Sequence, residues 1–277
     1  MDRLCYEHQL ISGAEPQYIL VDFVSDMDSF RSAIHILHML QKDVDRIKCV
    51  VIAYQEFLNL KESVKEYTRI DMIKMEMIAR SFFVEFDVFL NHWEKRINRH
   101  PKREELRKLF NNLTHDAYDS SDNYAMVTII RNYAIHSAGI INGVIWGKPY
   151  CDVSIWKHEL MSDNNISSNK KKIINRQSSE FILLQPMMRG ALDKLKQIHE
   201  TLVKSIIDEE TQAAMDVVGN EIKKIKEYGD KLWFFADDEG SLSAIDENGK
   251  MIEFIQGKCL EMFYWEDFEN LIASIRD

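Results

Sequence analysis

Apolar residues recur at alternating spacings of three and four along the segment that follows Asp26. The series is Phe30, Ala33, Leu37, Leu40, Val44, Ile47, Val51, Tyr54 and Leu58. This spacing places the apolar side chains on one stripe and predicts a single long helix, with Ser25 or Asp26 as its N-cap. Because antiparallel bundles pack with the same seam, the pattern favours an intramolecular helical bundle over a free coiled coil.

The next segment, from about Asp71 to Asn98, carries a broader apolar face. Its members are Met72, Met75, Ile78, Phe82, Phe83, Phe86, Phe89, Leu90, Trp93 and Ile97. A face of this width is typical of a helix that is buried against more than one neighbour. Glu85 and Asp87 interrupt it, either as solvated edge positions or as acidic partners of a buried arginine.

Turn and cap residues divide the following stretch. Pro101 indicates the start of a short helix with an apolar face at Leu106, Leu109, Phe110 and Leu113. Residues 116–123 are rich in Asp, Ser and Asn, which predicts a turn before another helix. That last helix is expected to end near Gly139 or Gly143.

The second half of the chain alternates between weak and strong patterns. Residues 162–179 are polar and contain Lys170, Lys171 and Lys172, which predicts a mobile loop. Helical spacing returns over residues 181–228, with a break near Asp208. Near the N-terminus, residues 18–24 fit either a short strand or the start of a buried helix.

The last segment changes to the period of strands. Apolar runs at 232–235, 241–246 and 251–255 are followed by a possible fourth strand at 259–263 and a helix at 265–275. Asn248-Gly249 lies between two of these runs, and both residues tolerate the positive φ of a type I′ hairpin turn. The segment therefore predicts a β-meander followed by a helix.

These patterns predict a mainly α protein: an antiparallel helical bundle with additional long helices and a small C-terminal α+β unit. The expected division is a helical domain at 1–150, a linker or mobile loop at 151–180, a helical extension at 181–230 and the C-terminal unit at 231–277.

Composition narrows the classes of function. The formal net charge of −10 argues against a protein that binds nucleic acid over a broad basic surface, although a local basic cleft remains compatible with it. The four cysteines, Cys5, Cys49, Cys151 and Cys259, show no zinc-like spacing, which favours reduced thiols. No signal peptide or membrane-spanning run is visible, so we expect a cytoplasmic protein that does not enter a membrane.

Candidate chemistry gathers in the helix-compatible run Val127–Ser137, where polar residues stand among apolar ones. Asn132 and His136 are four residues apart and lie one above the other on a helix. Arg131 and His136 are five apart and diverge by roughly 140° at 3.6 residues per turn. A pair of such helices around a two-fold axis would bring Arg131 of each copy toward His136 of the other.

The Arg131-Asn132-x-x-x-His136 spacing, together with the helices before it, resembles the motif of the HEPN superfamily. The similarity covers residues 26–147. It implies a homodimeric, metal-independent endoribonuclease that needs no cofactor, plausibly a toxin or anti-phage effector restrained by an antitoxin or regulatory protein. One position departs from many toxin-type relatives, because Ala138 stands where those carry a tyrosine.

The resemblance also implies roles for individual side chains. His136 would transfer protons, Arg131 would hold the scissile phosphate, and Asn132 would orient one of the two. Tyr133 could stack on a base or be a core aromatic, and Lys170, Lys171 and Lys172 could contact RNA phosphates or simply be solvated.

A structural reading of the same residues stays open. Arg131 would then be a surface charge and His136 a hydrogen-bonded histidine between helices, and the chain would be a non-catalytic scaffold or protein-interaction module. Its acidic net charge favours this alternative. His35 and His38 have the spacing of a helical metal pair, but no third ligand is suggested nearby and no metal site is expected.

Overall fold

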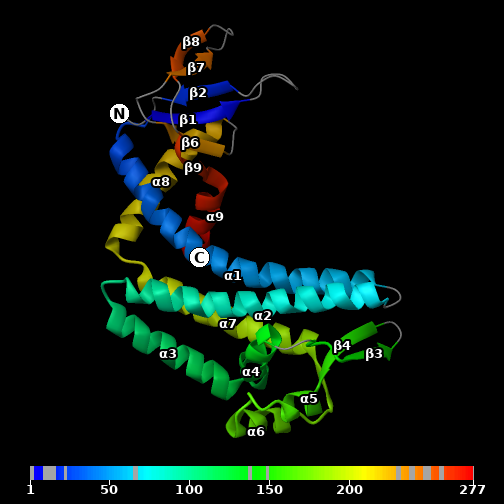
Figure 1. The fold of residues 1–277 in the computed structure, drawn as a ribbon. Helices are drawn as coiled ribbons and strands as arrows, with labels where there is room; N and C mark the ends of the chain where they lie inside the picture. Colours follow the sequence, from blue (N-terminus) through cyan, green and yellow to red (C-terminus); the bar gives the residue numbers. More distant parts are fainter. Residues whose placement is uncertain are drawn as a thin grey trace. The chain divides into compact units, whose positions relative to one another are not determined.

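A computed structural model describes residues 3–8, 17–21, 24–64, 68–136, 139–147, 150–228, 232–236, 241–245, 251–255 and 259–276. Over these residues the protein is mainly α-helical, as the apolar spacing predicts, with short antiparallel strands (Figure 1). The chain divides into two compact units, one formed by Met1–Lys42 with Ile206–Asp277 and the other by Asp43–Ser205. Helix α1 contributes residues to both units.

The unit 43–205 contains most of the helices. They are the C-terminal part of α1 (Met27–Ser63), then α2 (Arg69–Asn98), α3 (Arg103–Ser120), α4 (Asp122–His136), α5 (Lys157–Ser162), α6 (Ser168–Arg176) and α7 (Leu184–Ile206). A three-stranded antiparallel sheet, in the order β3-β4-β5, is built from β3 (Gly143–Gly147), β4 (Tyr150–Trp156) and β5 (Phe181–Leu183). Helix α6 lies within the segment whose polar composition predicts a loop.

Helix α2 starts and packs as its sequence dictates. Thr68 is its N-cap and forms a reciprocal capping box with Asp71, which satisfies backbone groups of the first turn. The aromatic residues of its apolar face are fully buried at Phe82, Phe83, Phe86, Phe89 and Trp93. Burial of side chains of this size is worth roughly 1.5–3 kcal/mol each, so α2 forms the centre of the core of this unit.

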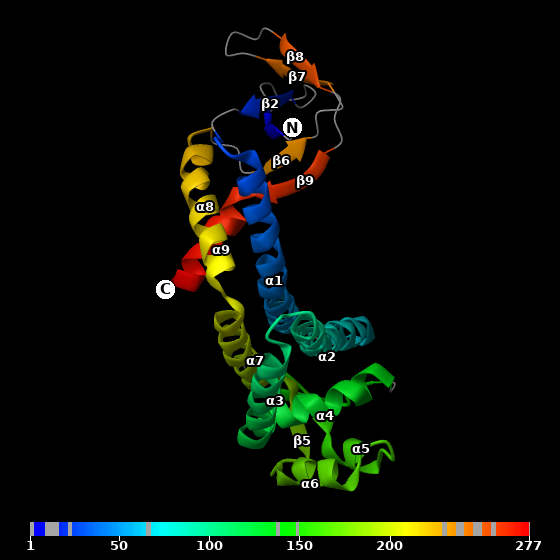
Figure 2. The same cartoon turned by 90° about the vertical axis from the view of Figure 1, so that its left-hand side faces the viewer.

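The unit formed by 1–42 and 206–277 combines strands from both ends of the chain. A four-stranded antiparallel sheet, in the order β2-β1-β6-β9, contains β2 (Gln17–Val21), β1 (Arg3–His8), β6 (Leu232–Ala236) and β9 (Cys259–Tyr264). Strands β7 (Ser241–Ile245) and β8 (Met251–Ile255) pair separately. Helices α8 (Glu209–Ile225) and α9 (Trp265–Arg276) pack against each other (Figure 2), and the short helix η1 (Lys226–Tyr228) follows α8.

Two features of this unit agree with the sequence patterns and one differs. The predicted break near Asp208 separates α7 from α8. Asp208 is the N-cap of α8 and accepts a hydrogen bond from the backbone N–H of Thr211. The pairing of β7 with β8 confirms the predicted hairpin, although Asn248 and Gly249 lie outside the described residues. The strand order is not a meander, because β6 pairs with β9 and with β1.

A buried aspartate occupies the seam of α1. Asp43 is fully buried, although the periodicity assigns Val44 to the seam at that turn. Its carboxylate oxygens contact two residues of α2: Nε2 of His92 at 2.7 Å and Nε of Arg96 at 3.1 Å. The buried charge is thus compensated, and the pair of contacts fixes the register between α1 and α2.

We predict that Asp43→Ala lowers the free energy of unfolding by about 3 to 5 kcal/mol, because it leaves His92 and Arg96 without their buried partner. Chemical denaturation measures the change. Asp45→Ala is the matched control on the same helix, where Asp45, whose side chain is 45% exposed, lies 3.6 Å from Lys48. The control should cost less than about 1 kcal/mol. Equal losses in the two variants would contradict a structural role for the Asp43 contacts.

His199 on α7 is a second buried polar group of this core. Its ring lies 6.1 Å from that of Phe89 and 5.8 Å from that of Trp93, and the residue is 8% exposed. Burial lowers its pKa from 6.5 to about 4, His92 lowers it further, and Asp43 opposes the shift. The imidazole is therefore neutral in the folded protein at neutral pH.

This depressed pKa predicts a pH-dependent contribution to stability. The unfolded chain binds the proton more readily, so this contribution is constant above about pH 6.5, declines as the pH falls toward 4, and levels off below that. The full loss is about 3 kcal/mol at 1.36 kcal/mol per pKa unit. Unfolding of the protein and of His199→Gln, compared at neutral and acid pH, isolates the effect. Parallel pH profiles would contradict the burial of a neutral imidazole.

Candidate functional site

Helix α4 carries the candidate motif and is buried along most of its length. It packs on α2, α3 and α6. Its buried residues are Tyr124, Ala125, Met126, Val127, Ile129, Ile130 and Ala134. A helix that is apolar on most sides has little surface left for function. Its exposed polar residues lie at both ends, with Asp122 and Asn123 in the first turn and Asn132 in the last two turns. The motif residues 131, 132 and 136 all fall in the last two turns, so a substrate would meet the motif at the C-terminal end.

Arg131 is held by an acidic residue of α2. Its Nη1 lies 2.8 Å from Oδ1 of Asp87, and the two side chains are 23% and 33% exposed. Its Nε is buried and has no hydrogen-bond partner among the described residues. Of the two readings of Asp87, the structure therefore supports a partner of a partly buried arginine. The pairing uses one side of the guanidinium and leaves further N–H donors for another acceptor.

The positive charge of Arg131 also affects the pKa of a buried tyrosine on the same helix. Tyr124 lies two turns earlier on α4, and burial raises the pKa of its phenol to about 12, while the positive charge of Arg131 opposes this rise. Tyr124 is therefore protonated at physiological pH and serves as a core residue.

The structure describes the side chain of Asn132 but only the backbone of His136. Asn132 is exposed next to Arg131. His136 is the last residue of α4, and its side chain lies outside the described residues, as does Ala138. The backbone therefore puts Arg131, Asn132 and His136 within the last two turns of one helix, as the spacing predicts.

Tyr133 lies half-buried in an acidic neighbourhood. Burial raises the pKa of its phenol, and the carboxylates of Glu159, Asp163 and Glu76 raise it further, while Arg80 lowers it. The three carboxylates outnumber the one cation, Arg80, so this neighbourhood is less favourable to a phosphate than to a base.

The three predicted RNA-contacting lysines lie on α6. Lys172 is exposed and donates a hydrogen bond to Oδ1 of Asn169 at 3.4 Å, whereas Lys170 and Lys171 are partly buried. At the end of α6, Arg176 lies 3.7 Å from Asp122 at the start of α4. The lysines are thus attached to a helix that contacts α4, at the end opposite His136.

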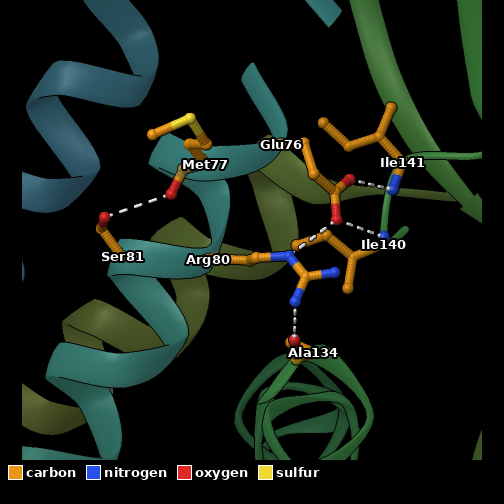
Figure 3. A network of polar contacts seen from close by, with 7 residues as sticks. All are labelled: Glu76, Met77, Arg80, Ser81, Ala134, Ile140 and Ile141. Atoms are coloured by element: carbon orange, nitrogen blue, oxygen red, sulfur yellow. Dashed lines mark hydrogen bonds and ion pairs between the residues drawn. The ribbon is translucent and has the colours of Figure 1, made fainter. Parts of the chain in front are cut away.

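The C-terminal end of α4 is held by two residues of α2 that the sequence patterns did not single out (Figure 3). Arg80 donates from Nη1 to the carbonyl oxygen of Ala134 at 2.6 Å, and its Nε lies 2.9 Å from Oε1 of Glu76. The carboxylate of Glu76 accepts hydrogen bonds from the backbone N–H groups of Ile140 at 2.7 Å and Ile141 at 2.9 Å. We call Glu76 and Arg80 the α2 bracket.

The sequence contains one signal of the α2 bracket. Glu76 and Arg80 have the spacing of an ordinary helical ion pair, which predicts their mutual contact but not their contacts with α4. Those contacts join residues more than fifty positions apart. Sequence spacing on a single helix has no information about such partners.

An exposed aromatic pair lies on the small sheet. Trp156 and Phe181 are directly opposite each other on β4 and β5, with ring centroids 6.3 Å apart and exposures of 37% and 44%. The ring of His158 lies 5.1 Å from that of Trp156. Exposed aromatic groups of this kind are typical of contact surfaces.

Within the described ranges, no three His, Cys, Asp or Glu side chains come together as a metal site would require. No described helix is both long enough and apolar enough to cross a bilayer. Comparison with known protein families, with curated proteins and with solved structures found no match.

A double-mutant cycle tests the contact that places Arg131. We expect a coupling of about 1 kcal/mol between Asp87→Ala and Arg131→Ala in the free energy of unfolding, because the pair is close and partly buried. The control cycle joins Asp122→Ala and Arg176→Ala, whose side chains are 54% and 62% exposed at 3.7 Å. Its coupling should be near zero. No coupling at Asp87 and Arg131 would mean that Asp87 does not hold the arginine.

Proposed function

We propose that this chain is a HEPN-like, metal-independent endoribonuclease. The observation that carries the proposal is the placement of Arg131, which Asp87 holds near the C-terminal end of a largely buried helix, beside exposed Asn132 and before His136. An arginine, an amide and an imidazole are sufficient to bind a phosphodiester and to move its protons.

The proposed reaction is an internal transfer at phosphorus. The 2′-oxygen of one nucleotide forms a bond to the adjacent phosphorus as the bond to the 5′-oxygen breaks, which leaves a 2′,3′-cyclic phosphate and a 5′-hydroxyl. His136 either takes the proton of the 2′-hydroxyl, with water protonating the leaving 5′-oxygen, or supplies the proton of the leaving oxygen, with water taking the proton of the 2′-hydroxyl. Either role is worth about 10²- to 10⁴-fold in rate. Arg131 stabilises the charge on the phosphoryl oxygens, and Asn132 orients the phosphate or the imidazole.

The site is proposed to be completed by a second copy of the chain. Arg131 and His136 diverge by roughly 140° on α4, so one helix brings them to a phosphate poorly and two facing helices do so better. Helix α2 supplies a candidate contact surface beside the bracket. Four apolar residues are exposed there at spacings of three, four and seven: Ile70 at 64%, Ile73 at 52%, Met77 at 63% and Val84 at 42%.

RNA contacts beyond the scissile phosphate would come from α6 and the small sheet. The segment 156–181 contains five Lys or Arg residues and three Asp or Glu residues, in contrast to the acidic chain as a whole. Lys170, Lys171 and Lys172 would meet phosphates, and Trp156 and Phe181 offer the stacking surface that unpaired bases use. An active enzyme of this kind would work in the cytoplasm and would need a restraint, such as an antitoxin or regulatory protein.

The proposal predicts that the purified protein cleaves single-stranded RNA in the presence of EDTA, and that His136→Ala and Arg131→Ala lose at least about 100-fold of the rate. A fluorescent RNA substrate and identification of the cyclic phosphate end provide the measurement. Circular dichroism establishes that the variants fold. A His136→Ala protein that cleaves as fast as the parent would refute the catalytic assignment.

The second candidate is a non-catalytic interaction module. The exposed apolar residues of α2 favour it, since surfaces of this type also bind proteins. Light scattering and the cleavage assay separate the two functions. A dimer without any cleavage of RNA would favour the module, whereas a dimer with EDTA-resistant cleavage would favour the enzyme.

A further inference from the structure

The α2 bracket binds the backbone on both sides of His136. Arg80 binds the carbonyl oxygen of Ala134, two residues before His136, and Glu76 binds the N–H groups of Ile140 and Ile141, four and five residues after it. Both side chains project from the same face of α2 because they are one turn apart. Ala134 on one side of His136, and Ile140 and Ile141 on the other, are therefore bound to the same helix (Figure 3).

The chemistry of the bracket suits this task. The last carbonyl groups of a helix have no partner within the helix and carry partial negative charge, so a guanidinium binds them favourably. A carboxylate that accepts two successive backbone N–H groups forms charge-assisted hydrogen bonds, which are about twice as strong as neutral ones. The contact between Arg80 and Glu76 then orients each group for its backbone partner.

The bracket also differs from an ordinary surface ion pair in its exposure. The side chains of Glu76 and Arg80 are 19% and 30% exposed, whereas those of Glu104 and Arg107 on α3 are 75% and 50% exposed. Loss of the Glu76 carboxylate would leave the backbone N–H groups of Ile140 and Ile141 without this acceptor. Loss of one partner of an exposed surface pair leaves only a solvated side chain.

We propose that Glu76 and Arg80 are positioning residues that hold the end of α4 so that His136 meets the substrate phosphate in a fixed orientation. The catalytic meaning of this inference rests on the proposed function, but the positioning itself does not. Since a displacement of about 1 Å at a reacting group can cost 100-fold in rate, the bracket would act on kcat and not on substrate binding.

The test compares the protein with Glu76→Gln, which keeps the size of the side chain but removes its charge and one of its two acceptor oxygens. We expect faster amide hydrogen exchange at Ile140 and Ile141, an altered NMR titration of the His136 imidazole, and a kcat lower by about 10- to 100-fold with little change in KM. Arg80→Lys keeps the positive charge and should retain part of the activity. Glu104→Gln is the control and should change none of these properties.

Each outcome bears on one of the two proposals. Slower cleavage by Glu76→Gln together with an altered His136 titration supports the bracket. An unchanged titration and unchanged amide exchange overturn it, whether or not the parent cleaves RNA. If the parent fails to cleave RNA, the proposed function fails, and the NMR titration and hydrogen exchange still decide whether Glu76 positions His136.

Discussion

The unit formed by residues 43–205 depends on the burial of helix α2, because one face of this helix forms the core and another binds α4. The aromatic face, with Phe82, Phe86 and Trp93 fully buried, forms the core. The polar face carries Glu76, Arg80 and Asp87, which are separated by one and then about two helical turns. All three contact α4 or the chain just beyond it. Because the buried face fixes α2 in the core, the side chains on its polar face hold their partners in α4 and just beyond it in defined positions.

The fold was predictable where a local period determines it. The long helices and the break at Asp208 follow from the spacing of apolar residues and from capping chemistry. The strand order was not predictable, because β1 pairs with β6 from the other end of the chain. Helix α6 was missed because residues 162–179 are polar and buried Ile174 alone marks its inner face.

The seam of α1 shows why an apolar period does not give the packing of a helix in full. The period runs through Val44, but the fully buried position at that turn is Asp43. An isolated charge would not be buried there, so the sequence signal of Asp43 lies on another helix, in His92 and Arg96. The same holds at the candidate site. The sequence indicates Arg131 and Asn132, and offers Asp87 as one of two alternatives, but it does not indicate the contacts of Glu76 and Arg80 with the end of α4.

The acidic net charge and the proposed RNA substrate are compatible because electrostatic interactions in water are local. At physiological ionic strength the Debye length is about 8 Å, so charges elsewhere on the chain are screened from the end of α4. What matters there is the balance near the phosphate, where Arg131 and the acidic group around Tyr133 oppose each other. Asp87 offsets part of the charge of Arg131, but the side of Arg131 is still more favourable for a phosphate than the side of Tyr133, where carboxylates outnumber cations.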